Sequence, residues 1–132
     1  MVDTALTPAE NIVVSSPLRF EETLAVLRTG IENAEMMVLH EIDTRRIIAR
    51  AGVESLGLRQ LLYFHPRFMK RVLEGNPAAV IEAPLKFVVR ETDESVAVHY
   101  ISPRFLFGRY EGLSELGEEL ETLAARVAIL KS

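Results

Sequence analysis

Three histidines, His40, His65 and His99, are the residues of this 132-residue chain that best fit catalysis or metal binding. A histidine can act as a general base or bind a transition metal near neutral pH. Convergence of the three with Glu41 or Asp43 would form such a site. However, their spacings match no metal-ligand motif, and each histidine lies on a different predicted strand. We therefore favour separate structural roles and expect neither a metal nor another cofactor.

The chain contains no cysteine, which excludes disulfides, thiolate nucleophiles, CxxC redox pairs and cysteine-ligated metal sites. Its 15 basic and 19 acidic residues give a formal net charge of −4. Nucleic-acid-binding proteins concentrate positive charge on one face to displace counterions from phosphates. The acidic balance therefore argues against a nucleic-acid partner.

The length and composition fit a single domain over residues 1–132. A chain of this size can bury roughly two thirds of the surface that it exposes when unfolded. Hydrophobic residues make up 48% of the chain and charged residues 26%, as in ordinary globular proteins. The opening MVDTALTPAENIVV has no basic region followed by an apolar one, and no apolar run is long enough to cross a membrane. We expect a cytoplasmic protein with no membrane partner.

The elements that must position the histidines follow from hydrophobic patterns. Residues 11–16 form a β-branched run that predicts a first strand. Residues 35–42 are apolar at nearly every position, which predicts a strand with partners on both faces. Between them, residues 19–34 predict a helix, because apolar residues recur at spacings of four, three and four: Phe20, Leu24, Leu27 and Ile31.

A short helix is predicted between Asp43 and Gly52. Aspartate is a favoured N-cap residue, and glycine is favoured just past the end of a helix. The N-cap position explains Asp43 without any catalytic role.

A second short helix is predicted after a strand over residues 58–65. Pro66 fits the first helical position and Gly75 the position just past the end. His65 is then the N-cap residue of this helix, although its acceptor is less suited to capping than that of Asn, Asp or Ser.

The clearest hairpin spans residues 84–101, with a polar turn around Thr92, Asp93 and Glu94. Its apolar face would form from the cross-strand pairs Val89–Val96, Phe87–Val98 and Leu85–Tyr100. The opposite face is mixed and partly accessible to water, and it carries Lys86, Val88, Arg90, Ala97, His99 and Ile101.

A long C-terminal helix is predicted from apolar residues spaced three and four apart, namely Leu113, Leu116, Leu120, Leu123, Val127 and Leu130. Its length favours a helix lying on a sheet over a coiled-coil seam. We expect both long helices on one sheet face, burying Leu24, Leu27, Leu120 and Leu123 against Phe87, Val89, Val96 and Val98. The fold class is α+β, an antiparallel β-sheet with helices packed on one face.

Three strings make residues 14–132 resemble the family called domain of unknown function 302: FEETLAVLRTGIENAEMMVLHEID, FHPRFMKRVLEGNPAAVIEAPLKFVV and VHYISP. The resemblance implies a TATA-binding-protein-like α+β fold with a β-α-β4-α core, here with two short extra helices, and a dimer. It implies no established activity, because function belongs to sites rather than to folds. Family members often have asparagine before the proline matching Pro66, with a cysteine close by, and another cysteine after the proline matching Pro84. His65 and Leu85 stand at those places here, so no thiol role carries over.

Two groups of side chains are candidates for ligand binding. Arg67, Lys70 and Arg71, with Arg45 and Arg46, could bind an anion at a helix N-terminus, although a solvated helix face is favoured. The apolar residues around the predicted third strand could line a pocket, although core packing is favoured for them: Tyr63, Phe64, Phe68, Met69 and Phe87.

Two functions are consistent with these features. The preferred one is a non-enzymatic dimeric module that binds a small anionic or apolar ligand between sheet and helices, with candidate contacts His65, Arg67, Tyr63, Phe68 and His99. The alternative is a hydrolase or lyase-type enzyme using His65 with Asp43 or His99. No nucleophile, base and oxyanion donor can be assembled from the sequence, which favours the binding module. Exposed apolar residues on the outer face of the hairpin and in FLFGRY favour a homodimer.

Overall fold

The computed structural model describes residues 7–131 and contains a five-stranded antiparallel sheet in the order β1-β5-β4-β3-β2. The strands are β1 (Asn11–Ser16), β2 (Met37–Asp43), β3 (Leu58–Phe64), β4 (Leu85–Glu91) and β5 (Val96–Ile101). The helices are α1 (Phe20–Asn33), α2 (Thr44–Ala49), α3 (Pro66–Gly75), α4 (Pro103–Gly108), α5 (Ser114–Val127) and the 3-10 helix η2 (Pro77–Glu82). The α+β class is therefore confirmed. The expectation about the opening MVDTALTPAENIVV falls partly on residues 1–6, which lie outside the described residues.

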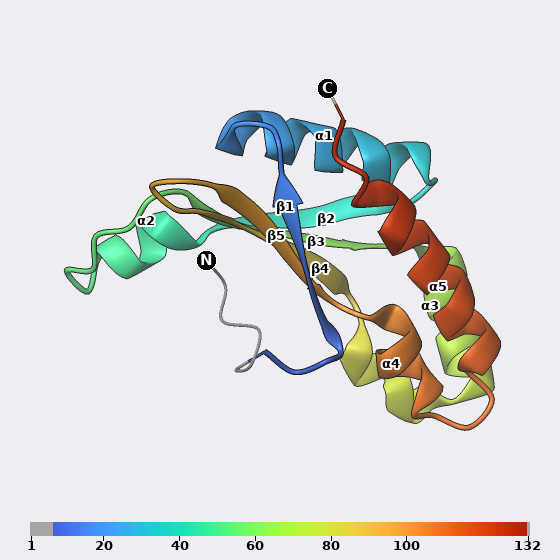
Figure 1. Ribbon diagram of the computed structural model, residues 1–132. Helices are drawn as coiled ribbons and strands as arrows, with labels where there is room; N and C mark the ends of the chain where they lie inside the picture. The colour runs from blue at the N-terminus through green and yellow to red at the C-terminus, as the bar shows by residue number, and fades with distance from the viewer. Residues whose placement is uncertain (1–6, 132) are drawn as a thin grey trace.

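Helices α1 and α5 pack on the same face of the sheet, as the sequence predicts (Figure 1). Leu24 and Leu27 of α1 and Leu120 of α5 share one buried cluster with the inward residues of β4 and β5. The two helices also touch, because a Cβ added at Gly30 would lie 3.3 Å from Cγ1 of Val127.

The predicted burial is wrong for one residue of α5, Leu123. Leu123 is only partly buried, whereas Ala124 is fully buried. The side of α5 that meets the core follows the buried residues Leu116, Leu120, Ala124 and Val127. Successive steps of four, four and three residues turn the buried stripe away from Leu123.

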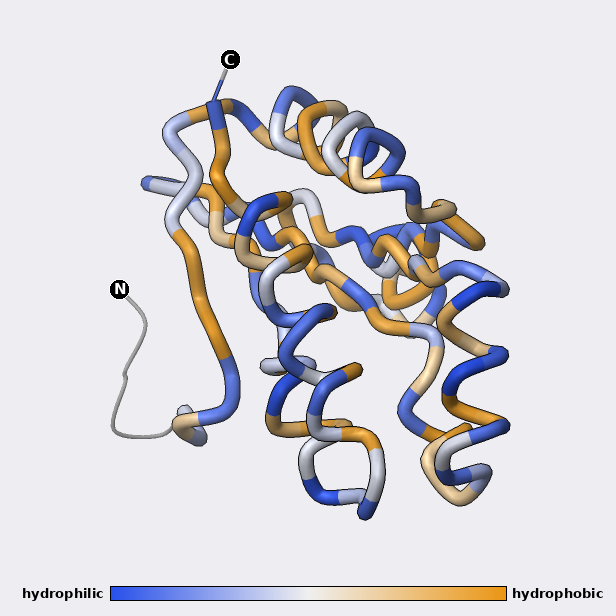
Figure 2. The backbone as a smooth tube through the Cα atoms, turned by 90° about the vertical axis from the view of Figure 1, so that its right-hand side faces the viewer, coloured by the Kyte–Doolittle hydropathy of each residue, from blue (hydrophilic) through white to orange (hydrophobic). Residues whose placement is uncertain are grey.

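The inner sheet face is the centre of the core. Phe87 and Val89 of β4 and Val98 of β5 have 0% exposure. The ring of Phe87 stacks on Tyr63 at 4.9 Å between centroids and meets Tyr100 edge-on at 5.2 Å. In Figure 2 the helices alternate between hydrophobic and hydrophilic segments, and the middle of β1 is hydrophobic, as this one-sided burial requires.

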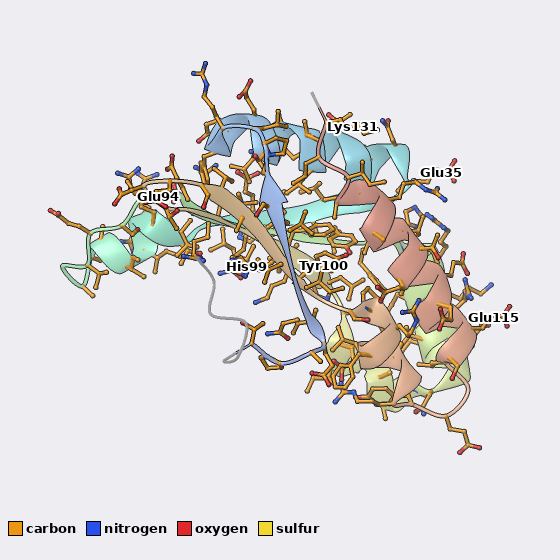
Figure 3. All side chains as sticks on the ribbon, viewed as in Figure 1. Glu35, Glu94, His99, Tyr100, Glu115 and Lys131 are labelled. Atoms are coloured by element: carbon orange, nitrogen blue, oxygen red, sulfur yellow. The ribbon has the colours of Figure 1, made fainter. Side chains whose placement is uncertain are left out.

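The outer sheet face is left uncovered by α1 and α5. Successive strand residues point to opposite faces, so the neighbours of Phe87 and Val98 point outward. Figure 3 shows His99 and Tyr100 on opposite sides of β5, with Tyr100 toward α5. The outer face therefore carries His99 together with Val88, its partner on β4.

The hairpin has the predicted inner face but a different register. Val89 pairs with Val98, and Val96 pairs with Glu91, so the predicted pairs are wrong by two residues. The turn lies one residue later than predicted, because the Thr92 N–H donates to the Ser95 carbonyl at 2.8 Å and leaves Asp93 and Glu94 as the central residues. A two-residue shift leaves every side chain on its original face.

The short helices begin where the sequence predicts. Asp43 precedes α2, and its Oδ1 accepts a hydrogen bond from Arg46 N at 3.2 Å. His65 precedes α3, and its Nδ1 accepts a hydrogen bond from Arg67 N at 3.1 Å. The predicted position of Gly75 is wrong, because it is the last residue of α3 and Asn76 is the C-cap. Gly75 instead allows close packing, since a Cβ there would lie 2.7 Å from Cδ2 of Leu113.

Two elements were not predicted, η2 and α4. Helix α4 begins as α3 does, with a capping residue followed by proline, since Ser102 Oγ accepts a hydrogen bond from Phe105 N at 3.2 Å. Much of FLFGRY lies in this helix, and its apolar side chains are only partly exposed, since Phe105 is 38% exposed and Leu106 is half-buried. Phe107 has 0% exposure, because it turns into the core beside α5.

We expect Gly57→Ala to lower the free energy of unfolding by about 1–3 kcal/mol, because the new Cβ would overpack the core. A Cβ there would lie 2.7 Å from two atoms of the Phe20 ring and 2.8 Å from a third. Gly108→Ala is the matched control, since a Cβ at Gly108 meets nothing within 4 Å. Urea denaturation measures both variants, and an equal effect of the two would contradict the packing explanation.

We expect His65→Ala to cost about 0.5–2 kcal/mol of unfolding free energy, because it removes the acceptor for Arg67 N–H. His65→Asn supplies a shorter acceptor and should leave the melting temperature equal to or slightly above that of the parent. Thermal unfolding of the three proteins at one protein concentration measures the difference. An asparagine variant as unstable as the alanine variant would show that the imidazole stabilises α3 by packing rather than by capping.

Candidate functional site

The three histidines do not converge. His40 lies on the edge strand β2, His65 follows β3, and His99 lies on β5. Strands β4 and β3 separate β5 from β2 in the sheet. Within residues 7–131, no group of three histidine, aspartate or glutamate side chains could hold a metal ion. The convergent histidine site is therefore wrong.

The histidine–aspartate pair of the enzymatic alternative is not formed either. Asp43 pairs with Arg59 near the start of β3, whereas His65 follows Phe64 at the other end. A strand rises about 3.3 Å per residue, which places the two side chains on the order of 20 Å apart. Asp43 and His65 are therefore too far apart for direct proton transfer.

Glu41 is held in a salt-bridge network that joins α1 to the sheet. Its two carboxylate oxygens accept hydrogen bonds from Arg28 at 2.8 and 2.9 Å, and Arg59 adds a third at 2.7 Å. The Arg28 hydrogen bond, together with Arg59, lowers the pKa of the Glu41 carboxyl in spite of its partial burial. A carboxylate stabilised in this way is a poor general base.

The predicted basic cluster is divided between two ends of the sheet. Arg45 and Arg46 lie in or beside α2, while Arg67 and Arg71 lie in α3 at the other end of β3. Arg71 pairs with Glu119 at 2.6 Å, and Arg67 lies over the Phe68 ring, 4.4 Å from its centroid. Arg67 also donates a hydrogen bond to the carbonyl oxygen of Glu35, just after α1. These side chains hold elements together rather than forming an anion site.

Tyr63 and Phe68 lie in the packed core, with 3% and 1% exposure. Burial raises the pKa of the Tyr63 hydroxyl, which therefore stays protonated. The space expected to hold a ligand beneath the main helices is filled by Phe87, Leu24 and Leu27, all with 0% exposure. The predicted site between the sheet and these helices is wrong for this reason.

A groove of about 650 Å³ lies instead across the outer sheet face, and we call it the outer groove. Apolar side chains from four strands form its floor: Val13 of β1, Leu62 of β3, Val88 of β4 and Ile101 of β5. Residues of η2, the following turn and α4 bound it, including Ile81, Pro84 and Leu106. The polar groups that it brings to this apolar floor include Lys86 and His99.

His99 is held as a neutral imidazole in this groove. Arg90 Nε donates a hydrogen bond to His99 Nε2 at 3.3 Å, so Nε2 is the acceptor nitrogen. Partial burial, assisted by the Arg90 charge, lowers the pKa of His99 below its ordinary value. The ring proton of the neutral form therefore resides on Nδ1, where it can be donated.

A second, apolar groove of about 540 Å³ runs beside α3, and we call it the α3 groove. Leu39 of β2 and Met69 and Leu73 of α3 line it, and His65 lies at one end. The sheet register shifts between Val38 and His40, so Leu39 is the extra residue of a β-bulge. His65 and His99 thus lie in different grooves.

Sequence reasoning found His99 as a candidate and placed Lys86 and Val88 on the same hairpin face, but it missed Val13 and Leu62 as neighbours. The signal for Lys86 and Val88 was present, because the outward face of the hairpin is mixed rather than uniformly polar. Val13 and Leu62 join that face only through the pairing of β1 with β5 and of β3 with β4. Pairing between strands that are distant in the sequence cannot be predicted from the local pattern of apolar residues.

No helix within residues 7–131 is long and apolar enough to cross a lipid bilayer. Comparison with curated proteins gives no match. The crystal structure of an uncharacterized conserved DUF302 protein from Bacillus stearothermophilus superposes with a TM-score of 0.82 at 21% identity, covering 91% of this chain and 97% of that one. The family model described as Domain of unknown function DUF302 matches residues 12–129. Since that match spans most of the 132 residues, the chain belongs to the DUF302 family.

Proposed function

We propose that the protein is a single-domain, homodimeric, non-enzymatic module that binds a small ligand in the outer groove. The observation that carries this proposal is an apolar floor on the sheet face that α1 and α5 leave uncovered, bordered by the donors Lys86 and His99. Small-molecule sites typically measure about 300–1,000 Å³ and combine an apolar lining with a few polar groups that orient the ligand. The outer groove fits both criteria.

The arrangement around His99 supports binding rather than catalysis. The partner of its Nε2 is Arg90, a cation, whereas an imidazole that serves as a general base is commonly oriented by a carboxylate. His65, the other histidine of the enzymatic alternative, uses Nδ1 to cap α3. Both rings therefore have a structural partner at one nitrogen, and neither activates a nucleophile within the described residues.

The α3 groove supports the homodimer. Leu39 and Leu73 remain 49% and 51% exposed there, and the lining is almost entirely apolar. Lys70 and Glu74 border the groove one helical turn apart, without an ion pair between them. A two-fold axis that crosses α3 midway between them would set each Lys70 opposite Glu74 of the second copy. The surface is thus complementary to itself in both polarity and charge.

Native mass spectrometry of the purified protein tests the ligand site. We expect a small molecule bound to each chain, and we expect Val88→Trp to abolish its binding because the indole fills the groove floor. Val53→Trp is the matched control, since Val53 is half exposed and lies outside the outer groove. A ligand retained by the Val88 variant, or lost equally from both variants, would contradict the proposed site.

Sedimentation equilibrium tests the dimer through a charge exchange. We expect Lys70→Glu to raise the dimer dissociation constant at least about tenfold, because two carboxylates would then face each other. The double variant Lys70→Glu/Glu74→Lys restores opposite charges and should restore the parental constant. Lys131→Glu makes the same change far from the α3 groove and serves as the control. A parent that sediments as a 14.8 kDa monomer at micromolar concentration would contradict the dimer.

A further inference from the structure

The outer sheet face has a local charge opposite to that of the whole chain. In the sheet register, one row of outward residues runs Val13, His99, Val88, Gln60 and Ile42. The flanking outward positions include Lys86 and Arg90 on β4, and the carboxylates Glu41, Asp43 and Glu91 all lie at inward positions. Among the described outward strand positions, the fully charged side chains are therefore both cationic, although the chain carries −4.

These two cations have no carboxylate partner among residues 7–131. Lys86 Nζ donates to Gln60 Oε1 at 3.2 Å, and Arg90 Nε donates to His99 Nε2 at 3.3 Å. Gln60 and His99 are the two cross-strand partners of Val88. Lys86 and Arg90 thus direct their charged groups toward the two residues that flank Val88 in the sheet. Positive charge therefore lies on both sides of Val88.

Among residues 7–131, the one acidic side chain that lines the outer groove is already paired. Glu82 Oε2 accepts hydrogen bonds from Arg109 at 2.7 Å and from the Tyr110 hydroxyl at 2.6 Å. Its side chain is only 13% exposed. Among the described residues, the groove therefore offers one lysine without a carboxylate partner, Lys86, beside Val88, and a neutralised carboxylate at its η2 end.

We infer that the ligand of the outer groove is a small amphipathic carboxylate. Its carboxylate binds between Lys86 Nζ and the Nδ1–H of His99, and its apolar body lies on Val13, Leu62 and Ile101. Arg90 is a positioning residue, because its hydrogen bond to Nε2 fixes the tautomer that turns Nδ1 into a donor. This inference rests on the proposed function, since it names the ligand class of the same groove.

A nucleic acid fits the same face less well. A protein that binds duplex DNA commonly neutralises about 6–10 phosphates with basic side chains. The outward strand positions supply two permanent cations, Lys86 and Arg90, which suit a ligand with one negative charge. The apolar floor likewise suits a hydrocarbon body rather than a phosphate backbone.

Isothermal titration calorimetry with three eight-carbon probes tests the inference on the full chain freed of any copurified ligand. Octanoate, octan-1-ol and octylamine share a hydrocarbon body and differ in the head group. We expect octanoate to bind at least about tenfold more tightly than octan-1-ol, because a charge-assisted hydrogen bond replaces a neutral one. Octylamine should bind most weakly, since its ammonium group would face Lys86.

Lys86→Met keeps the length of the side chain and removes its charge. We expect this variant to bind octanoate and octan-1-ol with similar affinity, while Lys131→Met, outside both grooves, keeps the parental preference. Equal affinity of the parent for octanoate and octan-1-ol would overturn the carboxylate inference and leave the groove as a ligand site. Failure of all three probes, together with no ligand on the purified protein, would overturn both proposals. Salt-dependent binding of a short DNA duplex that is lost in Lys86→Met would assign the face to nucleic acid and overturn the inference.

Discussion

Burial of one sheet face beneath α1 and α5 is the constraint on which the other features of this protein depend. The central strand β4 shows it most directly, because Phe87 and Val89 are fully buried, whereas Lys86, just before Phe87, points to the outer face and is exposed. Since strand side chains alternate, each inward residue that contacts α1 or α5 fixes the outward position of its neighbours. The outer groove follows from the same packing. Its floor consists of the strand residues whose side chains point away from α1 and α5.

The same constraint explains why the histidines are dispersed. His99 is outward because Val98 and Tyr100 must be inward, and His65 lies beyond the end of β3, where α3 begins. Each ring accepts a hydrogen bond from a nearby donor, which is the Arg67 backbone N–H for His65 and the Arg90 guanidinium for His99. Local satisfaction of polar groups accounts for both rings. The chemistry that remains available is the donor at His99 Nδ1, which faces neither the core nor a carboxylate.

Local patterns predicted the class of fold, the faces of the elements and the two helix starts at Asp43 and Pro66, because periodicity and capping act over a few residues. They failed at the hairpin register, because the bonds between Thr92 and Ser95 place the turn one residue later without changing either face. They also failed where distant residues decide. Gly75 looks like a helix terminator, but it is the last residue of α3 and packs against Leu113, far along the chain, where a Cβ would clash. Helix α4 could have been found, since Ser102 and Pro103 repeat the start of α3.

The candidate site could be predicted only in part, again because part of it depends on distant residues. The mixed outer face of the hairpin was visible in the sequence, but its meaning depends on what lies on the other side of the sheet. Helix α5 carries Glu115, Glu118, Glu119 and Glu121, and α1 carries Glu21 and Glu22, so much of the negative charge lies in the helical layer. At physiological ionic strength the Debye length is about 8 Å, comparable to the spacing of roughly 10 Å between packed layers. Those carboxylates are therefore largely screened from the outer face. An anion approaching that face would respond mainly to Lys86 and Arg90, so the net charge of the whole chain says little about which charge this face attracts.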